Sequence, residues 1–249
     1  MTNAKIRQVA ETESTGGQGA DEGLSVLRTN VVAQSLSDKV VNILVEAIER
    51  GELQPGTRIR EAVIARQLGI SRGPLREALG RLAGRKVLEY TPNLGMRVAK
   101  MSAKDIREIF EIREVLEGAA VRLATQRMED VQVEELSDLL EKHRHGAELR
   151  DGSAYYQRAG DLDFHFRIAS ASGNERLVQL LCEDLYHFLR IHRFRASAAP
   201  GRAPIAFEEH RAIVAAMRRR DADEAERLMR QHIRGALARL IEAPPDKPI

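Results

Sequence analysis

The sequence predicts a mainly α-helical protein with two domains, and three observations support this fold class. Apolar residues recur at helical spacing through most of the chain, and strand-like patterning is confined to a short segment near residue 90. Gly and Pro interrupt the helical pattern at several places, which divides it into separate helices. The length of 249 residues exceeds what one small core usually organises, so we expect a domain boundary.

Patterning and charge set the domain limits. Residues 1–30 are polar and Gly-rich and predict a disordered tail, and the Pro-rich residues 244–249 predict another. Between them we expect a first domain over 31–100 and a second over 101–243. Residues 30–100 hold 12 Lys and Arg against 7 Asp and Glu, although the whole chain has a net charge of only +2. This local basic excess favours a polyanionic partner for the first domain.

Composition also limits the class of protein. The chain is 43% hydrophobic and 31% charged, as in folded globular proteins. Its apolar runs are shorter than the roughly 18 residues that cross a bilayer, and the polar N-terminus lacks the apolar stretch of a signal peptide. We therefore expect a cytoplasmic protein with no membrane segment. Cys182, the single cysteine, has apolar neighbours at helical spacing and is expected in the core.

Three helices and a hairpin are expected in the first domain. A helical stripe begins at Ser37 and stops at Gly51, and a shorter helix runs from about Glu61 to Leu68 and ends at Gly69. After a three-residue turn, Ser71 is the expected N-cap of a third helix. Two short strands around a turn follow within residues 90–98 and would form a wing. The order of elements predicts a winged helix-turn-helix.

The third predicted helix carries the candidate DNA-reading residues. Arg72 and Arg76 are four residues apart and share the face opposite the apolar stripe. The fork of an arginine matches O6 and N7 of guanine, and a recognition helix reads bases with its N-terminal residues. The alternative is that these are ordinary surface arginines; the surrounding helices, turn, hairpin and basic charge favour DNA.

Two segments of the first domain resemble a known family. Gly51-Glu-Leu-Gln-Pro-Gly-Thr57 and Leu68-Gly-Ile-Ser-Arg-Gly-Pro-Leu-Arg-Glu-Ala-Leu79 resemble the winged helix-turn-helix of the GntR family of repressors, over residues 34–99. The resemblance implies that Arg72 and Arg76 contact DNA and that Gly95 shapes the wing. Lys86 occupies a position where the family commonly has a helix-ending Gly. The exit to the wing is therefore strained, or Lys86 adds a phosphate contact.

The second domain is expected to be an all-helical bundle that holds a metal. Asp161 and His165 are spaced i, i+4, so on one helix they would share a face. His210 and His232 each belong to an apolar stripe and are aimed inward. Three imidazoles and one carboxylate suit Zn²⁺ or Ni²⁺, with a coordination position left for a ligand. The alternative for each histidine is a hydrogen-bonded core residue.

Four other histidines are alternative candidates for the metal site. His192 also lies near an apolar stripe, whereas His143, His145 and His187 show no such convergence and are expected to be solvated.

A second resemblance covers about residues 102–240. Asp161-Leu-Asp-Phe-His165, Gly173-Asn174, Glu209-His-Arg-Ala-Ile213 and Met229-Arg-Gln-His232 resemble the C-terminal effector domain of FadR-type GntR proteins. Many members of that subfamily hold a divalent metal with one Asp and three His at the matched places. The resemblance implies that Asp161, His165, His210 and His232 are the ligands here.

Arg113 is a further inward charge, because it interrupts an apolar stripe. By resemblance to the family's Arg on this helix, we assign it to the carboxylate of an effector, whose other oxygen would approach the metal. The alternative is an internal salt bridge to a neighbouring acid such as Glu117.

These inferences predict a homodimeric repressor that binds double-stranded operator DNA and is released by a small organic acid. Two rival classes remain at this stage. A metal-dependent enzyme would use the same ligands to activate water, and a pure metal sensor would not need Arg113.

Overall fold

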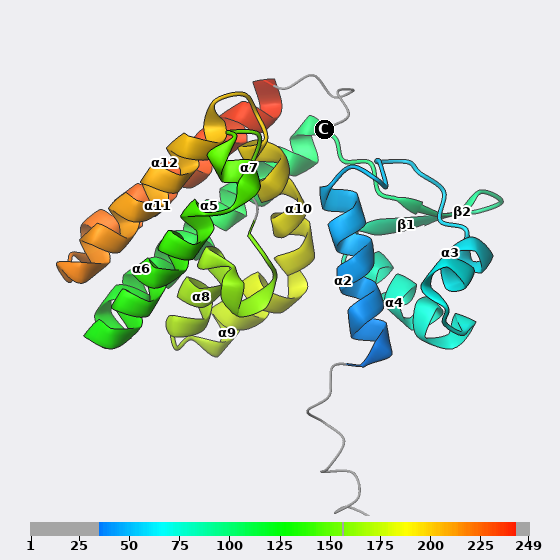
Figure 1. The fold of residues 1–249 in the computed structure, drawn as a ribbon, viewed down its shortest axis with the longest axis horizontal. Coiled ribbons are helices and arrows are strands. Elements are labelled where there is room, and N and C mark those ends of the chain that lie inside the picture. Colours follow the sequence, from blue (N-terminus) through cyan, green and yellow to red (C-terminus); the bar gives the residue numbers. More distant parts are fainter. Residues whose placement is uncertain (1–34, 156, 243–249) are drawn as a thin grey trace, which may run out of the picture. The chain divides into compact units, whose positions relative to one another are not determined.

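The computed structural model describes residues 35–155 and 157–242 of the chain. The two predicted tails, 1–30 and 244–249, lie outside these residues. The described part is mainly helical, as predicted, with one short hairpin near the N-terminal end (Figure 1). Among the described helices, none is long and apolar enough to cross a membrane.

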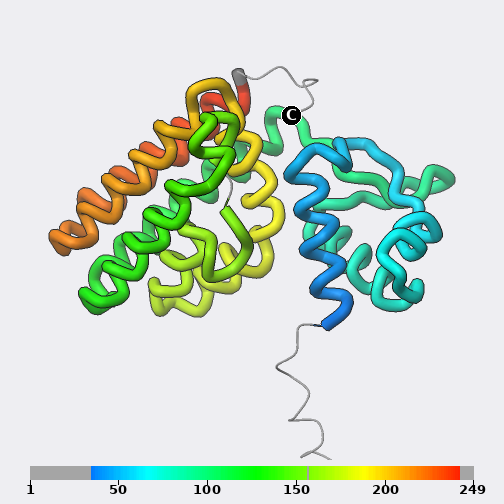
Figure 2. The backbone as a smooth tube through the Cα atoms, in the orientation of Figure 1, coloured from blue at the N-terminus to red at the C-terminus, as the bar shows by residue number. Residues whose placement is uncertain are grey.

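The first domain is a three-helix unit followed by a hairpin. The chain passes through three helices and two strands, which are α2 (Leu36–Glu49), α3 (Glu61–Leu68), α4 (Arg72–Gly84), β1 (Leu88–Thr91) and β2 (Gly95–Val98). Helix α3 has the predicted bounds, and Gly69 ends it with a left-handed φ of 64°. Ser71 is the N-cap of α4 as expected. Figure 2 follows the chain from α4 into the hairpin.

The core of this domain is built from the apolar stripes that the sequence shows. Val40, Leu44 and Val45 of α2 are buried together with Leu75, Leu79 and Leu82 of α4. The hairpin is antiparallel, with Leu88 opposite Val98 and Thr91 opposite Gly95. Ile59 joins it, because its N–H donates to the Met96 carbonyl at 2.9 Å. These contacts fix the wing to the three helices.

The second domain is a helical bundle. Its long helices are α5 (Ala103–Arg127), α6 (Asp130–Arg144), α10 (Tyr186–Ser197), α11 (Arg202–Arg218) and α12 (Ala222–Glu242). Short elements connect them, namely α7 (Ala147–Arg150), the 3-10 helix η1 (Gly160–Leu162), α8 (Phe164–Ala171), α9 (Glu175–Val178) and the π-helix η2 (Gln179–Asp184).

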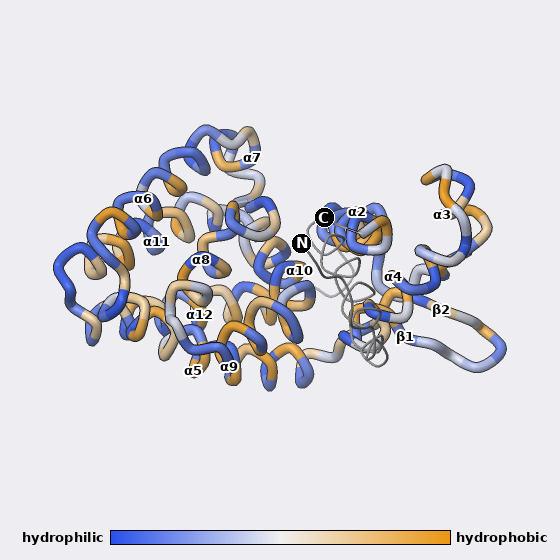
Figure 3. The backbone as a smooth tube through the Cα atoms, turned by 90° about the horizontal axis from the view of Figure 1, so that it is seen from below, coloured by the Kyte–Doolittle hydropathy of each residue, from blue (hydrophilic) through white to orange (hydrophobic). Residues whose placement is uncertain are grey.

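The long helices pack side by side, and α12 lies against both α5 and α11. Helix α12 lies along α5, and α6 packs against α11 (Figure 1). Apolar and polar residues alternate along these helices, so each has an apolar face to bury (Figure 3). Phe110, Leu136, Phe164, Ile213 and Met229 are buried in the resulting core. A capping box between Ser102 and Asp105 starts α5, which fixes where the bundle begins.

Candidate DNA interface and candidate metal centre

The face of α4 that is turned away from its domain core carries the two predicted arginines. Arg72 and Arg76 are exposed, while Leu75 and Leu79 of the same helix are buried. Nε of Arg76 donates to Oε2 of Glu61 on α3 at 2.8 Å, and the Arg76 side chain stays 67% exposed. Exposed ion pairs of this kind stabilise little, so the guanidinium can exchange partners at low cost. The arrangement suits a helix that presents cations to DNA.

Two backbone positions shape the wing. Gly95 has a φ of +79° at the start of β2, a conformation that residues with a Cβ rarely adopt. Lys86 also has a positive φ, of 57°, at the exit from α4. This agrees with the strain expected where a lysine replaces a helix-ending glycine. The Lys86 side chain is exposed.

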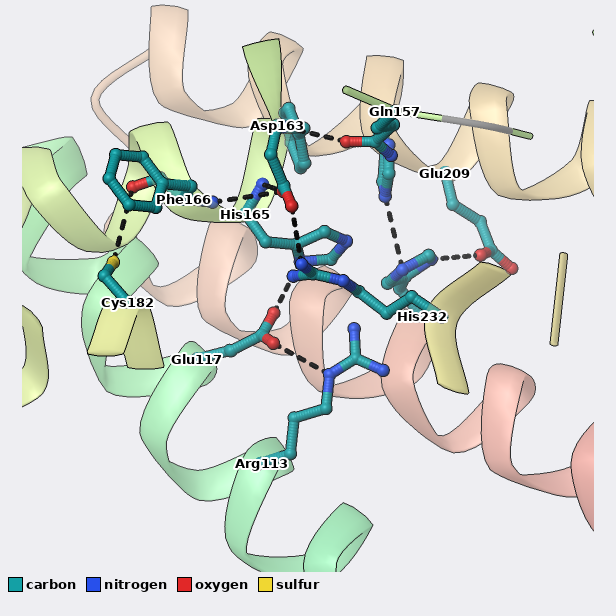
Figure 4. A network of polar contacts seen from close by, with 12 residues as sticks. Arg113, Glu117, Gln157, Asp163, His165, Phe166, Cys182, Glu209 and His232 are labelled. Carbon is teal, nitrogen blue, oxygen red and sulfur yellow. Dashed lines mark hydrogen bonds and ion pairs between the residues drawn. The ribbon is translucent and has the colours of Figure 1, made fainter. Parts of the chain in front are cut away.

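Three of the predicted metal-binding residues come together in the second domain. His165 on α8, His210 on α11 and His232 on α12 are buried, and one nitrogen of each lies within 4.8 Å of the others. Nε2 of His210 is 3.2 Å from Nε2 of His232. Helices far apart in the sequence therefore converge on one point, and Figure 4 shows this network from close by.

Each of these histidines is held by a group on its Nδ1 side. Nδ1 of His165 donates to Oε2 of Glu117 at 2.5 Å, and Nδ1 of His232 donates to Oε2 of Glu209 at 2.6 Å. Nδ1 of His210 lies 3.3 Å from the hydroxyl of Tyr155. Partners of this kind fix the ring orientation and leave Nε2 as the coordinating atom.

Electrostatics keep the three rings neutral. Burial lowers the pKa of His165 to about 4 and also lowers the pKa values of His210 and His232. Neutral imidazole is the form that binds a metal ion, so the donor set fits a borderline divalent ion such as Zn²⁺ or Ni²⁺.

Asp161 does not join this cluster. Its side chain is exposed on η1, and η1 ends before α8 begins at Phe164. The prediction that Asp161 and His165 share one helical face was wrong, because the chain breaks its helical path between them. Asp163 is buried instead and is the N-cap of α8, where Oδ1 accepts hydrogen bonds from the backbone N–H groups of His165 and Phe166. Its Oδ2 pairs with Arg193 at 2.6 Å.

Arg113 lies beside the histidines and is completely buried. Its Nε donates to Oε1 of Glu117 at 2.7 Å, so the internal salt bridge considered from the sequence is present. Nη1 and Nη2 of the same guanidinium are buried without a hydrogen-bond partner among the described residues. A buried donor without a partner is costly. Nη1 and Nη2 of Arg113 are therefore suited to donate hydrogen bonds to a bound anion.

Several site residues were not found from the sequence. Tyr155 and Glu209 were missed, although Glu209 is adjacent to His210 in the chain. His143, expected to be solvated, contacts the Tyr155 hydroxyl through Nδ1 at 3.0 Å and the Leu162 carbonyl through Nε2 at 2.9 Å. His187 was also expected at the surface, and it is buried on α10 together with His192. His145 is exposed as expected.

Known families match both domains. Residues 36–98 match the family of bacterial regulatory proteins called gntR, and residues 108–235 match the FCD domain. The "Nta operon transcriptional regulator" of Aminobacter aminovorans is 31% identical over 191 residues, which cover 76% of this chain and 87% of that protein. The "HTH-type transcriptional repressor GlaR" of Escherichia coli K12 is 30% identical, covering 75% and 87%.

Solved structures show the same architecture. The "E. coli McbR/YncC" structure has a TM-score of 0.67 and 26% identity, covering 82% of this chain and 96% of that one. A putative GntR regulator from Rhodococcus sp. RHA1 has a TM-score of 0.66 and 25% identity, covering 84% and 98%. These relatives are transcription regulators and not enzymes by name.

Proposed function

The chain belongs to the gntR family of bacterial regulatory proteins, and from this premise we propose that it is a repressor released from its operator by a small carboxylate that binds beside a divalent metal. That it is a DNA-binding transcription regulator follows from the family itself. The name of the E. coli relative GlaR supports repression as the direction of control. The observation that supports the release mechanism is the buried guanidinium of Arg113 beside three converging histidines. Among the described residues its Nη1 and Nη2 atoms have no hydrogen-bond partner.

For the DNA step, we propose that Arg72 and Arg76 read base edges in the major groove. Gly95 would let the wing turn approach the duplex closely, and Lys86 would contact a phosphate. A cytoplasmic homodimer with two such domains would match a palindromic operator, because its two-fold symmetry mirrors that of the site.

For the sensing step, His165, His210 and His232 would hold the ion. When bound, the ion supplies a positive charge and an open position for a carboxylate oxygen. Nη1 and Nη2 of Arg113 would donate to the same carboxylate as a fork. Glu117 keeps both partners in place, because its two oxygens contact Nε of Arg113 and Nδ1 of His165.

The metal proposal is tested by elemental analysis of purified variants. We expect about one zinc or nickel ion per chain in the wild type and its loss in His210→Ala and His232→Ala. Asp161→Ala serves as the comparison, because Asp161 is exposed and apart from the histidines, so its ion content should be kept. Full occupancy in both histidine variants would reject this ligand set.

The DNA proposal is tested by fluorescence anisotropy on a fragment selected from a random-sequence library. We expect Arg72→Ala or Arg76→Ala to weaken specific binding by about 1–3 kcal/mol each while the fold is kept. Arg211→Ala is a matched control, since Arg211 is an exposed arginine with an acidic partner on α11 of the other domain. Unchanged affinity in both α4 variants would contradict the assignment.

A further inference from the structure

The hydroxyl of Tyr155 lies between two histidines. It is 3.0 Å from Nδ1 of His143 on α6 and 3.3 Å from Nδ1 of His210 on α11. Tyr155 is buried, whereas His143 is partly exposed. A tyrosine hydroxyl has one hydrogen to donate and an oxygen that accepts. To bond both rings, it must therefore donate to one of them and accept from the other.

The contact between His143 and Leu162 fixes one end of this hydrogen-bond chain. Nε2 of His143 lies 2.9 Å from the carbonyl oxygen of Leu162 on η1. A carbonyl oxygen only accepts, so Nε2 carries the ring hydrogen. Burial lowers the pKa of His143, so the ring is neutral at neutral pH and its Nδ1 has no hydrogen. Nδ1 can then only accept, and Tyr155 donates to it.

The contact between His232 and Glu209 fixes the other end. Nδ1 of His232 lies 2.6 Å from Oε2 of Glu209, and Figure 4 shows the two side chains in contact. A carboxylate accepts, so Nδ1 of the neutral His232 ring carries the hydrogen and its Nε2 is unprotonated. This Nε2 faces Nε2 of His210 at 3.2 Å.

The direction of the chain sets which nitrogen of His210 carries a hydrogen. Because Tyr155 donates to His143, its oxygen accepts from Nδ1 of His210. Nε2 of His210 is then unprotonated, like the Nε2 of His232 that it faces. Two unprotonated imidazole nitrogens directed at one point are what a metal ion requires, because coordination uses the nitrogen lone pair.

The opposite direction would close the metal site. If Tyr155 donated to Nδ1 of His210, that ring would carry its hydrogen on Nε2, and Nε2 would donate to His232. Nδ1 of His143 would then donate to Tyr155, and its unprotonated Nε2 would face the Leu162 carbonyl. The contact between His143 and Leu162 disfavours this arrangement.

We propose that His143 is a positioning residue of the metal centre, which acts through Tyr155 to keep Nε2 of His210 free for the ion. This inference rests on the proposed metal site and adds a residue that does not touch the ion. The alternative is a purely structural role, in which His143 only holds η1 against α6 through the Leu162 carbonyl.

Two amide variants separate these roles, because each keeps one half of the imidazole. The amide of asparagine takes the place of Nδ1 and can still accept from Tyr155, whereas the amide of glutamine reaches the place of Nε2 and can still donate to Leu162. In a chelator competition at neutral pH, we expect His143→Gln to weaken zinc binding about tenfold and His143→Asn to stay within about threefold of the wild type. His145→Asn is the matched control, since His145 is exposed at the end of α6, and should bind zinc like the wild type.

A double-mutant cycle tests whether the effect passes through Tyr155. In the Tyr155→Phe background the hydroxyl is gone, so adding His143→Gln should weaken zinc binding by less than about twofold. Nitrogen NMR of the wild type gives a second measurement, because protonated and unprotonated imidazole nitrogens differ in chemical shift. With zinc bound, His143 should carry its hydrogen on Nε2 and none on Nδ1.

The other outcomes overturn the proposal in distinct ways. Zinc affinity that is kept in His143→Gln and lost in His143→Asn would leave His143 as a structural anchor, and equal affinities in the two variants would remove its link to Tyr155. A full effect of His143→Gln without the Tyr155 hydroxyl, or an equal loss in His145→Asn, would also overturn it. A hydrogen on Nδ1 of His143 in the zinc-bound wild type would refute the direction of the chain, even if the variants do not fold. Absence of zinc binding by the wild type would overturn the proposed metal site itself, whereas the other results leave that site standing.

Discussion

Glu117→Gln should strongly destabilise the second domain, although the substitution changes the shape of the side chain very little. The side chain of Glu117 is 5% exposed, accepts from Nε of Arg113 at 2.7 Å and from Nδ1 of His165 at 2.5 Å, and the Arg113 side chain is fully buried. Glutamine keeps the shape but removes the charge that compensates the guanidinium. Loss of one partner of a buried pair costs about 3–5 kcal/mol. For a chain of this length that corresponds to a fall in Tm of about 6–20 °C.

The matched control lies on the same helix. Glu108 pairs with Lys104 at 3.6 Å with i, i+4 spacing, but the two side chains are 58% and 78% exposed. Glu108→Gln should therefore change the free energy of unfolding by at most about 1 kcal/mol. The assay is thermal and guanidinium unfolding of the metal-free proteins, followed by circular dichroism. If Glu117→Gln melts within about 2 °C of Glu108→Gln, the reasoning about buried charge fails.

Three further perturbations have defined outcomes. Tyr155→Phe removes the hydroxyl near His210 and should weaken zinc binding about 10–100-fold in a chelator competition, with unchanged affinity contradicting it. Gly95→Ala places a Cβ at a φ of +79° and should lower the unfolding free energy by about 1–2 kcal/mol in guanidinium titrations, whereas no change would mean the wing relaxes freely. Acid should destabilise the metal-free protein. Burial lowers the pKa of His165 to about 4 and that of His192 to about 3, below the unfolded value of about 6.5. The unfolded chain therefore binds more protons, and the free energy of unfolding falls as the pH drops below about 6.5. Tm at pH 5 should therefore be below that at pH 7.5, and His192→Leu should flatten the difference; a Tm independent of pH would refute this.

Features that depend on neighbouring residues within one helix were predicted from the sequence. Helix α3 has its predicted ends because the apolar stripe stops at Leu68 and Gly69 supplies the left-handed exit. The inward direction of His210 and His232 followed from the same periodicity, because a stripe on a helix must face a core. The pair Arg113 and Glu117 was also accessible, since i, i+4 neighbours meet on any helix.

The remaining features depend on packing between distant segments. The hydroxyl of Tyr155 reaches His210 across 55 positions of sequence, and no local pattern indicates such a contact. The spacing i, i+4 puts Asp161 and His165 on one face only if the chain stays helical, and it does not do so between η1 and α8. His187, which was expected to be solvated, is buried because α10 has buried residues around its whole circumference, so periodicity could not show which side was solvated.

The origin of the three histidines on α8, α11 and α12 has a consequence for the lifetime of the protein. An ion bound to them would act as a removable cross-link between segments that are 45 and 22 positions apart in the chain. Closing such loops removes conformations from the unfolded ensemble, and this effect grows slowly with loop length. A chain without the ion would open more often and expose its backbone to proteases. Metal supply would then regulate how long each molecule of this regulator survives, in addition to how it responds.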